Sequence, residues 1–273
     1  CCYAPYSIPG ALLTRHFSKN NCIWIHTDYY YLYNGDNQKI KNFFNERYIV
    51  DFKHIIFVAN EARDHFVDIY PKLKNKTVIC NNLVDKDYIV KMANEQIEDI
   101  KPIKPLFINI ARHDEHSKKI TRLIEAASLL KQSKFDFEIW LIGNGDDTKK
   151  YEDKIKKLQL EEKIKLLGFK NNPYPYYKLA DAFILTSEYE GFPVVYLESL
   201  IFDVPIITTI DVSGDGLTIK GRYGLIAPKS ARGVFEKMKQ FIDEKYEIKQ
   251  SFDALKYNSL IQKKIEDMFN NKW

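Results

Sequence analysis

Two glutamates separated by seven residues stand where the sequence predicts a turn from a strand into a helix. Glu190 lies in the segment 187–199 (SEYEGFPVVYLES), and Glu198 follows Pro193 by five residues, about 7.5 Å along a helix. Pro193 suits a first helical turn, because its missing N–H has no partner to lose there. The unpaired amides of a helix start favour an anion such as phosphate, and Gly191 lets a ligand approach the backbone closely. The two carboxylates are therefore predicted to contact different parts of one extended, phosphate-bearing ligand.

For a single glutamate, the alternative is a cap or a lysine ion pair on an ordinary helix. Two cations strengthen the functional interpretation. Arg112 and Lys118 follow a predicted strand at 106–111. Arginine offers a planar fork and lysine a point charge, and both suit phosphate. Two solvated surface cations are the alternative for this pair.

The chain also contains several histidines and a cluster of N-terminal tyrosines. His26 ends a predicted strand at 21–26, where a lone histidine is more often structural, and only the family resemblance described below makes it a functional candidate. His54, His113 and His116 are interpreted as structural. The tyrosines at 29–31 and 33 are interpreted mainly as packing residues, with stacking on an acceptor sugar or lipid as the alternative.

Short apolar strands and amphipathic helices alternate along the chain, which favours parallel sheets covered on both faces. The predicted strands are 21–26, 54–59, 77–80, 106–111, 137–143, 163–168, 182–187, 205–210 and 225–227. The predicted helices are 61–70, 86–99, 117–131, 148–158, 173–179, 193–202, 231–244 and 253–269. The two prolines of 101–105 (KPIKP) cannot continue a helix, so we expect the domain linker there. In open parallel sheets ligands bind beyond the carboxyl ends of the strands, where the candidate residues lie.

Composition excludes several classes of protein. The 273 residues suggest about two domains, and 45% hydrophobic residues exclude wholesale disorder. A net charge of +4 is too balanced for a protein that grips nucleic acid. The four cysteines form no C-x-x-C pair and no spacing that suggests zinc, so we expect buried or free thiols in a reducing, cytoplasmic setting. No run of 18 apolar residues predicts a membrane span. The start Cys-Cys-Tyr, without Met or a signal peptide, predicts a piece of a longer protein.

The segment 190–198 (EGFPVVYLE) resembles the E-x7-E motif of family 4 glycosyltransferases, which have the GT-B fold. Other segments are similar to this family as well. They are 111–112 with Lys118 and 121–126, the glycine turn 141–145, the base-contacting loop Gly168-Phe169, and 171–181 (NNPYPYYKLAD). The resemblance extends from about residue 20 to residue 260 and is most specific over 106–200.

The resemblance implies an α/β protein of two Rossmann-like lobes with parallel sheets. Residues 1–100 would form a partial N-terminal, acceptor-side lobe, and 106–250 a C-terminal lobe that binds a nucleotide-sugar. Residues 251–273 would form a helix that crosses back to the first lobe. The first lobe is expected to be incomplete, because nothing before residue 20 supplies the family's first strand and glycine-rich loop.

The resemblance also implies a role for each candidate residue. Arg112 and Lys118 would neutralise the diphosphate, and Glu198 would bind the ribose hydroxyls. Glu190 and His26 would contact the donor sugar. The catalytic candidates are thus His26, Glu190, Arg112 and Lys118, and the donor-binding candidates are Gly168, Phe169, Gly191, Phe192, Pro193 and Glu198. No metal or other cofactor is expected.

The implied activity is that of a retaining glycosyltransferase of the hexosyltransferase type. It would move a sugar from a nucleoside-diphosphate-sugar donor to a surface polysaccharide or glycolipid. The expected partners are the donor and a saccharide or lipid-linked saccharide acceptor, and a peripheral contact with the inner face of the membrane is compatible with such an acceptor. The main alternative is a non-catalytic, truncated nucleotide-sugar-binding module or subunit. A nucleotide-sugar epimerase is a further alternative.

Overall fold

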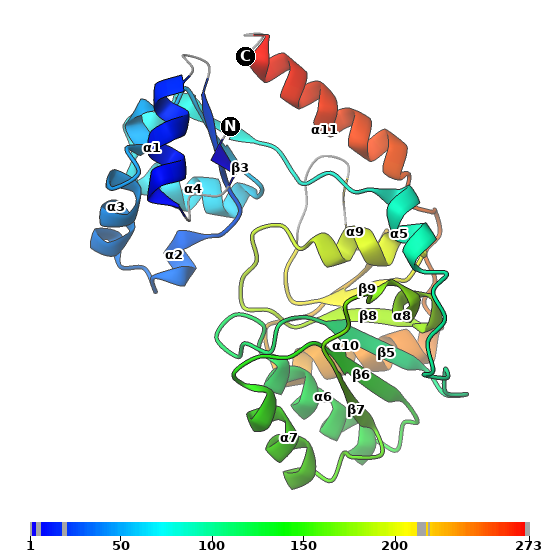
Figure 1. The fold of residues 1–273 in the computed structure, drawn as a ribbon. Helices are drawn as coiled ribbons and strands as arrows, with labels where there is room; N and C mark the ends of the chain where they lie inside the picture. The colour runs from blue at the N-terminus through cyan, green and yellow to red at the C-terminus, as the bar shows by residue number, and fades with distance from the viewer. Residues whose placement is uncertain (1, 4–6, 18–20, 212–216, 218, 271–273) are drawn as a thin grey trace. The chain divides into compact units, whose positions relative to one another are not determined.

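The chain forms two compact units, shown as a ribbon in Figure 1. Unit 1 comprises Cys1–Leu83, Tyr189–Phe192 and Leu255–Trp273, and unit 2 comprises Val84–Glu188 and Pro193–Ala254. The computed structural model describes residues 2–3, 7–17, 21–211, 217 and 219–270. Among these residues, no helix has both the length and the apolar composition needed to cross a membrane.

Unit 1 is built on a four-stranded parallel sheet in the order β1-β2-β3-β4. The strands are β1 (Cys2–Tyr3), β2 (Cys22–Ile25), β3 (His54–Phe57) and β4 (Thr77–Ile79). The helices are α1 (Ile8–Phe17), α2 (Tyr29–Leu32), α3 (Asn37–Asn45), α4 (Asn60–Ile69) and α11 (Ala254–Phe269), with 3₁₀ turns at Ile49–Asp51 and Pro71–Lys76. Apolar side chains of β2 and β3 pack with Phe44 and Phe66 to form its core.

The expectation that no strand precedes residue 20 is wrong. β1 pairs in parallel with β2, and α1 follows it along the chain. A two-residue strand is too short to show an alternating pattern, which is why the sequence gives no signal for β1. Pro9 and Gly10 argue against a helix, but they lie in the first turn of α1, where proline is tolerated.

Unit 2 is built on a six-stranded parallel sheet in the order β10-β9-β8-β5-β6-β7. The strands are β5 (Leu106–Ile110), β6 (Glu138–Ile142), β7 (Ile164–Gly168), β8 (Ala182–Leu185), β9 (Ile206–Thr208) and β10 (Gly224–Ile226). The helices are α5 (Lys86–Met92), α6 (Ile120–Gln132), α7 (Thr148–Lys157), α8 (Tyr174–Leu179), α9 (Val194–Ile201) and α10 (Ala231–Glu244). The strand order reverses between the neighbours β5 and β8, and such a switch point is where doubly wound sheets bind ligands.

Helices cover both faces of the unit 2 sheet. Figure 1 shows α6, α7 and α10 packed together on one side, and α5, α8 and α9 on the other. Phe107 faces the first group, where it meets Phe241 of α10. Trp140 and Phe183 face the second group, where they meet tyrosines of α8. The strands are therefore buried on both sides, which confirms the predicted parallel sheets.

The structure divides the chain earlier than the predicted linker at 101–105. The side chains of α8 and its flanking loops hold the segment after α5 within unit 2. Asn172 Nδ2 donates to the Met92 carbonyl at 2.8 Å, and Tyr176 OH donates to Asp99 Oδ2 at 2.8 Å. The boundary thus falls between Leu83 and Val84. The helix predicted over 86–99 ends at Met92.

The second segment of unit 1 is also not predicted from the sequence. Residues Tyr189–Phe192, which carry the first glutamate of the E-x7-E motif, group with unit 1 and interrupt the second unit. The C-terminal helix α11 groups with unit 1 as well, where Tyr257 OH donates to the Asn82 carbonyl at 2.9 Å.

Candidate functional site

A cavity of about 460 Å³ lies at the switch point of the unit 2 sheet. The ends of β5 and β6, the loop after β7 and the first turn of α9 enclose it. Its lining residues are Ile110, Ala111, Arg112, Ile142, Gly143, Asn144, Phe169, Lys170, Pro173 and Val195. A mostly apolar hollow with a few convergent polar groups is the usual form of a small-molecule site.

Arg112 stands at this cavity on the loop that leaves β5. Its side chain is 74% exposed, and Nη2 donates to Asp114 Oδ2 at 3.1 Å. Burial alone would raise the pKa of Asp114, but hydrogen bonds from Ser117 and from the His116 amide, with the charge of Arg112, outweigh it and lower the pKa. Asp114 therefore stays ionised and orients the guanidinium, which keeps most of its donors for a ligand.

The turn after β6 packs directly against the same loop. Gly143 has φ +142°, and a Cβ added there would overlap the Ala111 carbonyl oxygen. The His113 amide donates to the Asn144 carbonyl at 2.8 Å. Only glycine allows this approach, so Gly143 brings two walls of the cavity together.

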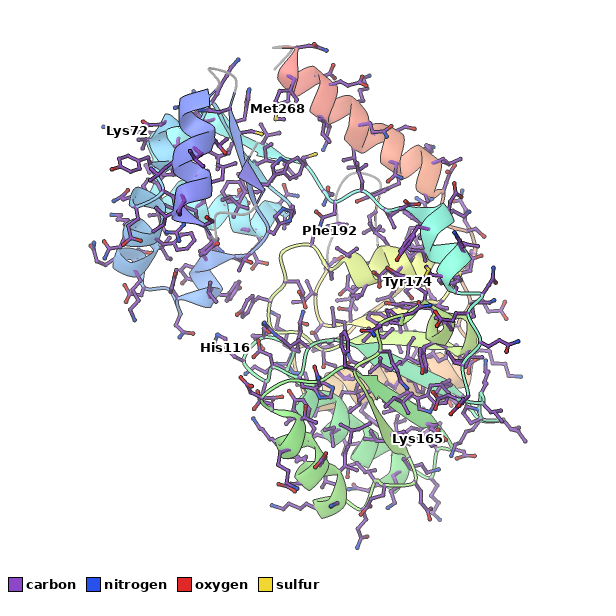
Figure 2. All side chains as sticks on the ribbon, viewed as in Figure 1. Lys72, His116, Lys165, Tyr174, Phe192 and Met268 are labelled. Carbon is purple, nitrogen blue, oxygen red and sulfur yellow. The ribbon has the colours of Figure 1, made fainter. Side chains whose placement is uncertain are left out.

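The histidines of this loop take structural positions. His113 is buried, its Nδ1 lies 2.8 Å from Thr148 Oγ1, and burial lowers its pKa, so the ring is neutral at pH 7. His116 lies exposed on the loop, where Figure 2 labels it.

Glu198 lies on α9, outside the lining of the cavity. Tyr177 OH donates to its Oε2 at 2.9 Å. Burial raises the pKa of Glu198, and the hydrogen bond from Tyr177 only partly opposes this. Burial and the charge of Glu198 raise the pKa of Tyr174, which opens α8 and is labelled in Figure 2. The second glutamate of the motif is thus a half-buried carboxyl with tyrosines beside it.

The candidates of unit 1 meet at the carboxyl end of β2. His26 follows that strand and stacks with Trp24, with ring centroids 6.1 Å apart. Burial lowers the pKa of His26, so its imidazole is neutral at pH 7. A Cβ added to Gly191 would overlap the His26 carbonyl oxygen. The motif glycine therefore allows the loop of Glu190 to pack on the backbone of His26.

The nearby tyrosines mainly pack against one another and against neighbouring rings. Tyr29 is buried, with its ring 4.3 Å from that of Phe43. The ring of Tyr31 stacks on that of Tyr189, with centroids 5.0 Å apart, and its hydroxyl donates to Glu61 at 2.9 Å.

The structure thus groups the predicted residues into two sets. In unit 2, Arg112 and Phe169 line the cavity, whereas Gly168, Lys118, Pro193 and Glu198 lie outside its lining. In unit 1, His26 lies against Gly191, in the loop that also carries Glu190 and Phe192. The sequence analysis missed Asn144, Lys170 and Pro173 as lining residues. The glycine turn 141–145 and the segment 171–181, both noted for their resemblance, contain the only signal for two of these three residues.

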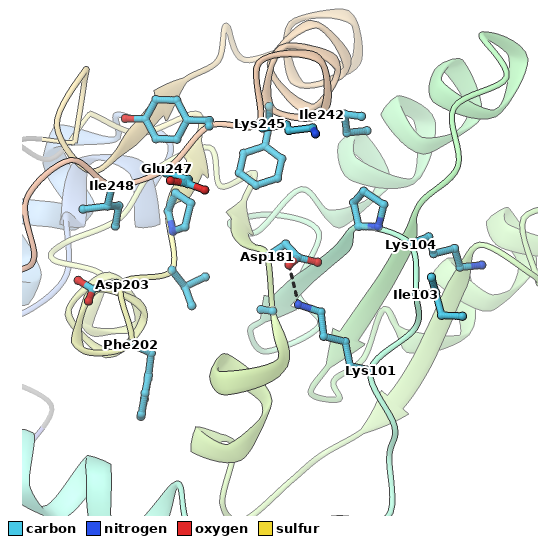
Figure 3. A pocket seen from close by; sticks show the side chains of 16 residues that line it. Lys101, Ile103, Lys104, Asp181, Phe202, Asp203, Ile242, Lys245, Glu247 and Ile248 are labelled. Carbon is cyan, nitrogen blue, oxygen red and sulfur yellow. Dashed lines mark hydrogen bonds and ion pairs between the residues drawn. The ribbon is translucent and has the colours of Figure 1, made fainter.

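A second cavity, of about 650 Å³, lies at the amino ends of the strands of the unit 2 sheet. Figure 3 shows its lining, with Lys101 pointing toward Asp181. The Asp181 carboxylate accepts from Lys101 Nζ at 2.6 Å and from the Leu106 amide at 2.8 Å. These contacts anchor the 101–105 segment to the amino ends of the strands. Nowhere in the described parts of the chain do three His, Cys, Asp or Glu side chains group so as to hold a metal ion.

A family model described as "Glycosyl transferases group 1" matches residues 90–259. The chain belongs to this glycosyltransferase family. Its match covers the whole cavity lining and Glu198. The first part of the chain, which includes His26, lies outside the match.

Several curated proteins are similar to this chain. The N-acetylgalactosamine-N,N'-diacetylbacillosaminyl-diphospho-undecaprenol 4-alpha-N-acetylgalactosaminyltransferase of Campylobacter jejuni is 34% identical over 51% of this chain and 36% of its own length. The lipopolysaccharide 1,6-galactosyltransferase of Escherichia coli is 29% identical over 50% of this chain and 37% of its own. The chain spans about two fifths of the length of such relatives.

Solved structures show the same fold at low sequence identity. Anabaena HepE in complex with UDP has a TM-score of 0.75 and 16% identity, covering 97% of this chain and 78% of its own. Staphylococcus aureus TarM has a TM-score of 0.69 and 17% identity, covering 98% of this chain and 51% of its own. These likenesses confirm the predicted GT-B-like α/β fold.

Proposed function

We propose that this chain carries out retaining glycosyl transfer from a nucleoside-diphosphate-sugar to a surface polysaccharide or glycolipid. The observation that carries the proposal is the mostly apolar cavity at the switch point of the unit 2 sheet, with Arg112 beside it. Its volume of about 460 Å³ suits a nucleoside, and a helix start at Val194 adjoins it. The family of the chain supports the reaction class.

The base, the diphosphate and the ribose of the donor differ in chemistry, and we assign each of them to different residues. Phe169 is 64% exposed beside Gly168 and offers its ring face to a nucleotide base. Arg112 and Lys118 would bind the diphosphate, with the amides of the α9 start after Pro193 as further donors. Glu198 would hold the ribose hydroxyls as an acceptor.

The unit 1 candidates are proposed to contact the donor sugar. His26 is neutral, so it can accept or donate a hydrogen bond to a sugar hydroxyl without repelling the cationic charge that develops on the sugar. Glu190 and the amides near Phe192 would contact the same sugar. The leaving diphosphate gains negative charge, which fixed cations stabilise most strongly in the transition state. Because Arg112, Lys118 and the helix start can supply that charge, we propose that transfer needs no added metal, and that EDTA leaves it unchanged.

The acceptor class rests on the relatives. They include a lipopolysaccharide galactosyltransferase, a diphospho-undecaprenol glycosyltransferase and the poly(glycerol-phosphate) alpha-glucosyltransferase of Bacillus subtilis. These acceptors are surface polymers or lipid-linked precursors. We therefore propose a saccharide or lipid-linked saccharide acceptor, met in the cytoplasm at the inner face of the membrane.

Thermal unfolding with UDP, GDP or ADP tests the donor site directly. A nucleotide at one hundred times its dissociation constant adds about 2.7 kcal/mol. At about 2–4 °C per kcal/mol for a chain of this size, one base should raise the Tm by several degrees. Arg112→Ala should weaken that nucleotide at least about 10-fold, because a hydrogen bond to a charged group contributes about 1.5–3 kcal/mol.

Arg232→Ala is the matched control. Arg232 is exposed on α10 and pairs with Glu236 at 2.6 Å, away from the cavity lining. This variant should keep the full shift. If no nucleotide shifts the folded wild-type protein, the donor site is wrong. If one nucleotide binds but none of its sugar derivatives is ever cleaved or transferred, the non-catalytic binding module is the better description.

A further inference from the structure

The segment that leads from β8 toward Glu190 is held by side chains instead of by the sheet. β8 ends at Leu185, so residues 186–188 have left the strand ladder. Their three carbonyls nevertheless all accept hydrogen bonds. Residue 186 accepts from Arg122 Nη1 at 2.9 Å, residue 187 from Thr209 Oγ1 at 2.6 Å, and residue 188 from Lys229 Nζ. Three elements far apart in sequence thus fix one short stretch of backbone.

Arg122 contacts the segment 186–188 through two hydrogen bonds. Besides the residue 186 carbonyl, its Nη2 donates to Glu188 Oε2 at 2.6 Å. The Arg122 side chain is only 12% exposed. Burial alone would raise the pKa of Glu188, but the hydrogen bond from Arg122 and the charges of Lys229, Arg122 and Lys119 lower it. The carboxylate therefore stays charged and keeps the guanidinium in one orientation.

The same segment holds the loop that carries Lys118. Thr186 Oγ1 donates to the carbonyls of Lys118 at 3.2 Å and Lys119 at 3.1 Å. The Glu188 amide donates to the Ser117 carbonyl at 2.7 Å. Lys119 has φ +50°, a left-handed conformation that a lysine keeps only when its surroundings impose it. Residues 186–188 thus hold the carbonyl side of the Lys118 backbone, while its amide donates to the Asp114 carbonyl at 2.8 Å.

We propose that Arg122 is a positioning residue that, by holding residues 186–188, fixes the backbone of Lys118 for binding the donor diphosphate. This inference rests on the proposed function, in which Lys118 contacts the diphosphate. Arg122 is not among the residues that line the cavity, and two of its guanidinium nitrogens donate hydrogen bonds within the protein. It therefore acts through Lys118, because a cation stabilises the leaving diphosphate best when its place is set before the reaction.

Isothermal titration of Arg122→Leu separates this role from a general loss of structure. The probes are the nucleoside diphosphate that shifts the wild-type Tm and its own nucleoside, for example UDP and uridine. We expect about 10-fold weaker binding of the diphosphate and unchanged binding of the nucleoside, since only the phosphates contact Lys118. The double variant Arg122→Leu with Lys118→Ala should bind the diphosphate no more weakly than Lys118→Ala alone.

Two further variants keep the test informative if Arg122→Leu does not fold. Arg122→Lys retains the charge but lacks the planar fork, so it should show a smaller loss of diphosphate binding. Glu188→Gln retains an acceptor for Arg122, so this variant should also lose only part of the affinity for the diphosphate. Glu125→Gln is the control on the same helix: it breaks the pair with Lys154 of α7 and should bind both probes like wild type.

Equal weakening of the diphosphate and the nucleoside, or additive losses in the double variant, would overturn the positioning role. So would wild-type affinity for the diphosphate in Arg122→Leu. In each of these outcomes the wild-type protein still binds the nucleotide, so the proposed function stands. Failure of wild type to bind any nucleotide would instead remove the proposed function, and the positioning role with it.

Discussion

At the scale of single residues, the half-buried carboxyl of Glu198 is a group of the candidate site whose ionised form is disfavoured by burial. It is surrounded by tyrosines of α8, and Tyr177 OH is its hydrogen-bond donor at 2.9 Å. A carboxylate with so little solvation destabilises the folded state unless it is neutralised or fully hydrogen-bonded. Residues of this kind are retained where a ligand needs them, at the expense of stability.

Glu198→Gln should therefore raise the stability of the protein at neutral pH. Burial raises the folded pKa of Glu198, so the unfolded chain ionises first as pH rises above about 4.5. From there upward the wild-type protein loses stability that the glutamine variant keeps. The Tm of the variant should exceed that of wild type at pH 7 and match it below about pH 4.5, as measured by thermal unfolding across pH.

The same substitution should weaken nucleotide binding at least about 10-fold, because a neutral amide is a poorer acceptor for ribose hydroxyls than a carboxylate. Glu236→Gln, on the surface of α10, serves as the control and should change neither property at neutral pH. A Glu198→Gln protein that is less stable than wild type at pH 7 would show that the carboxylate is better solvated than the structure indicates.

At the scale of elements, the apolar strands were predictable and the short capped helices were not. Every predicted strand is present, because a buried parallel strand leaves a continuous apolar run. The polar helix α3 (NQKIKNFFN) was missed, since only Ile40 and Phe44 are buried on it. Its start depends on Asp36, whose side chain accepts from the Gln38 and Lys39 amides. Such a cap is visible only once the backbone is placed.

The residues of the candidate site also divide into those that the sequence predicts and those that it does not. Arg112 and Phe169 were predictable, because both follow strand ends and both resemble family positions. Arg122 lies in the segment 121–126 noted for its resemblance, but its contacts gave no signal, because its partners at 186 and 188 are 64 and 66 positions away in sequence. On a helix it looks like any exposed arginine. Contacts between distant segments that depend on side-chain orientation cannot be inferred from local spacing.

The turn after β6 carries the next prediction. Gly143→Ala should destabilise the protein by about 2–3 kcal/mol, which is near the upper end for single substitutions. The methyl group would overlap the Ala111 carbonyl oxygen, and the backbone at φ +142° disfavours a side chain. Because the displaced loop carries Arg112, nucleotide binding should fall as well. Chemical denaturation and titration measure the two effects.

Gly221→Ala separates backbone strain from the clash. Gly221 also has positive φ, at +74°, but a Cβ there meets no atom within 4 Å. We expect a loss of about 1 kcal/mol and wild-type nucleotide affinity. If both alanine variants behave alike, close packing between the two loops is not what requires Gly143.

At the scale of the whole molecule, each unit has a hydrophobic core of its own, and the cavity belongs to unit 2 alone. Hydrogen exchange with a saturating nucleoside diphosphate should therefore show local protection. Amides at 110–112, at 142–144 and in the first turn of α9 should exchange up to about 100-fold more slowly at one hundred times the dissociation constant. Mass spectrometry of peptic peptides measures this.

The internal reference is β3 in the centre of the unit 1 sheet. Its amides should exchange at the same rate with and without nucleotide, because none of the unit 1 residues that the structure describes lines the cavity. Slowing of β3 equal to that of unit 2 would contradict a nucleotide site confined to the cavity of unit 2.

The confinement of the cavity to one unit has a consequence for how such proteins diversify. Every side chain that lines it comes from the stretch between Ile110 and Val195. A new base preference can therefore arise by substitution within that stretch, with β2 and the loop around His26 left as they are. Recombination that exchanges this part of a gene would combine one base preference with a different unit 1 in a single step.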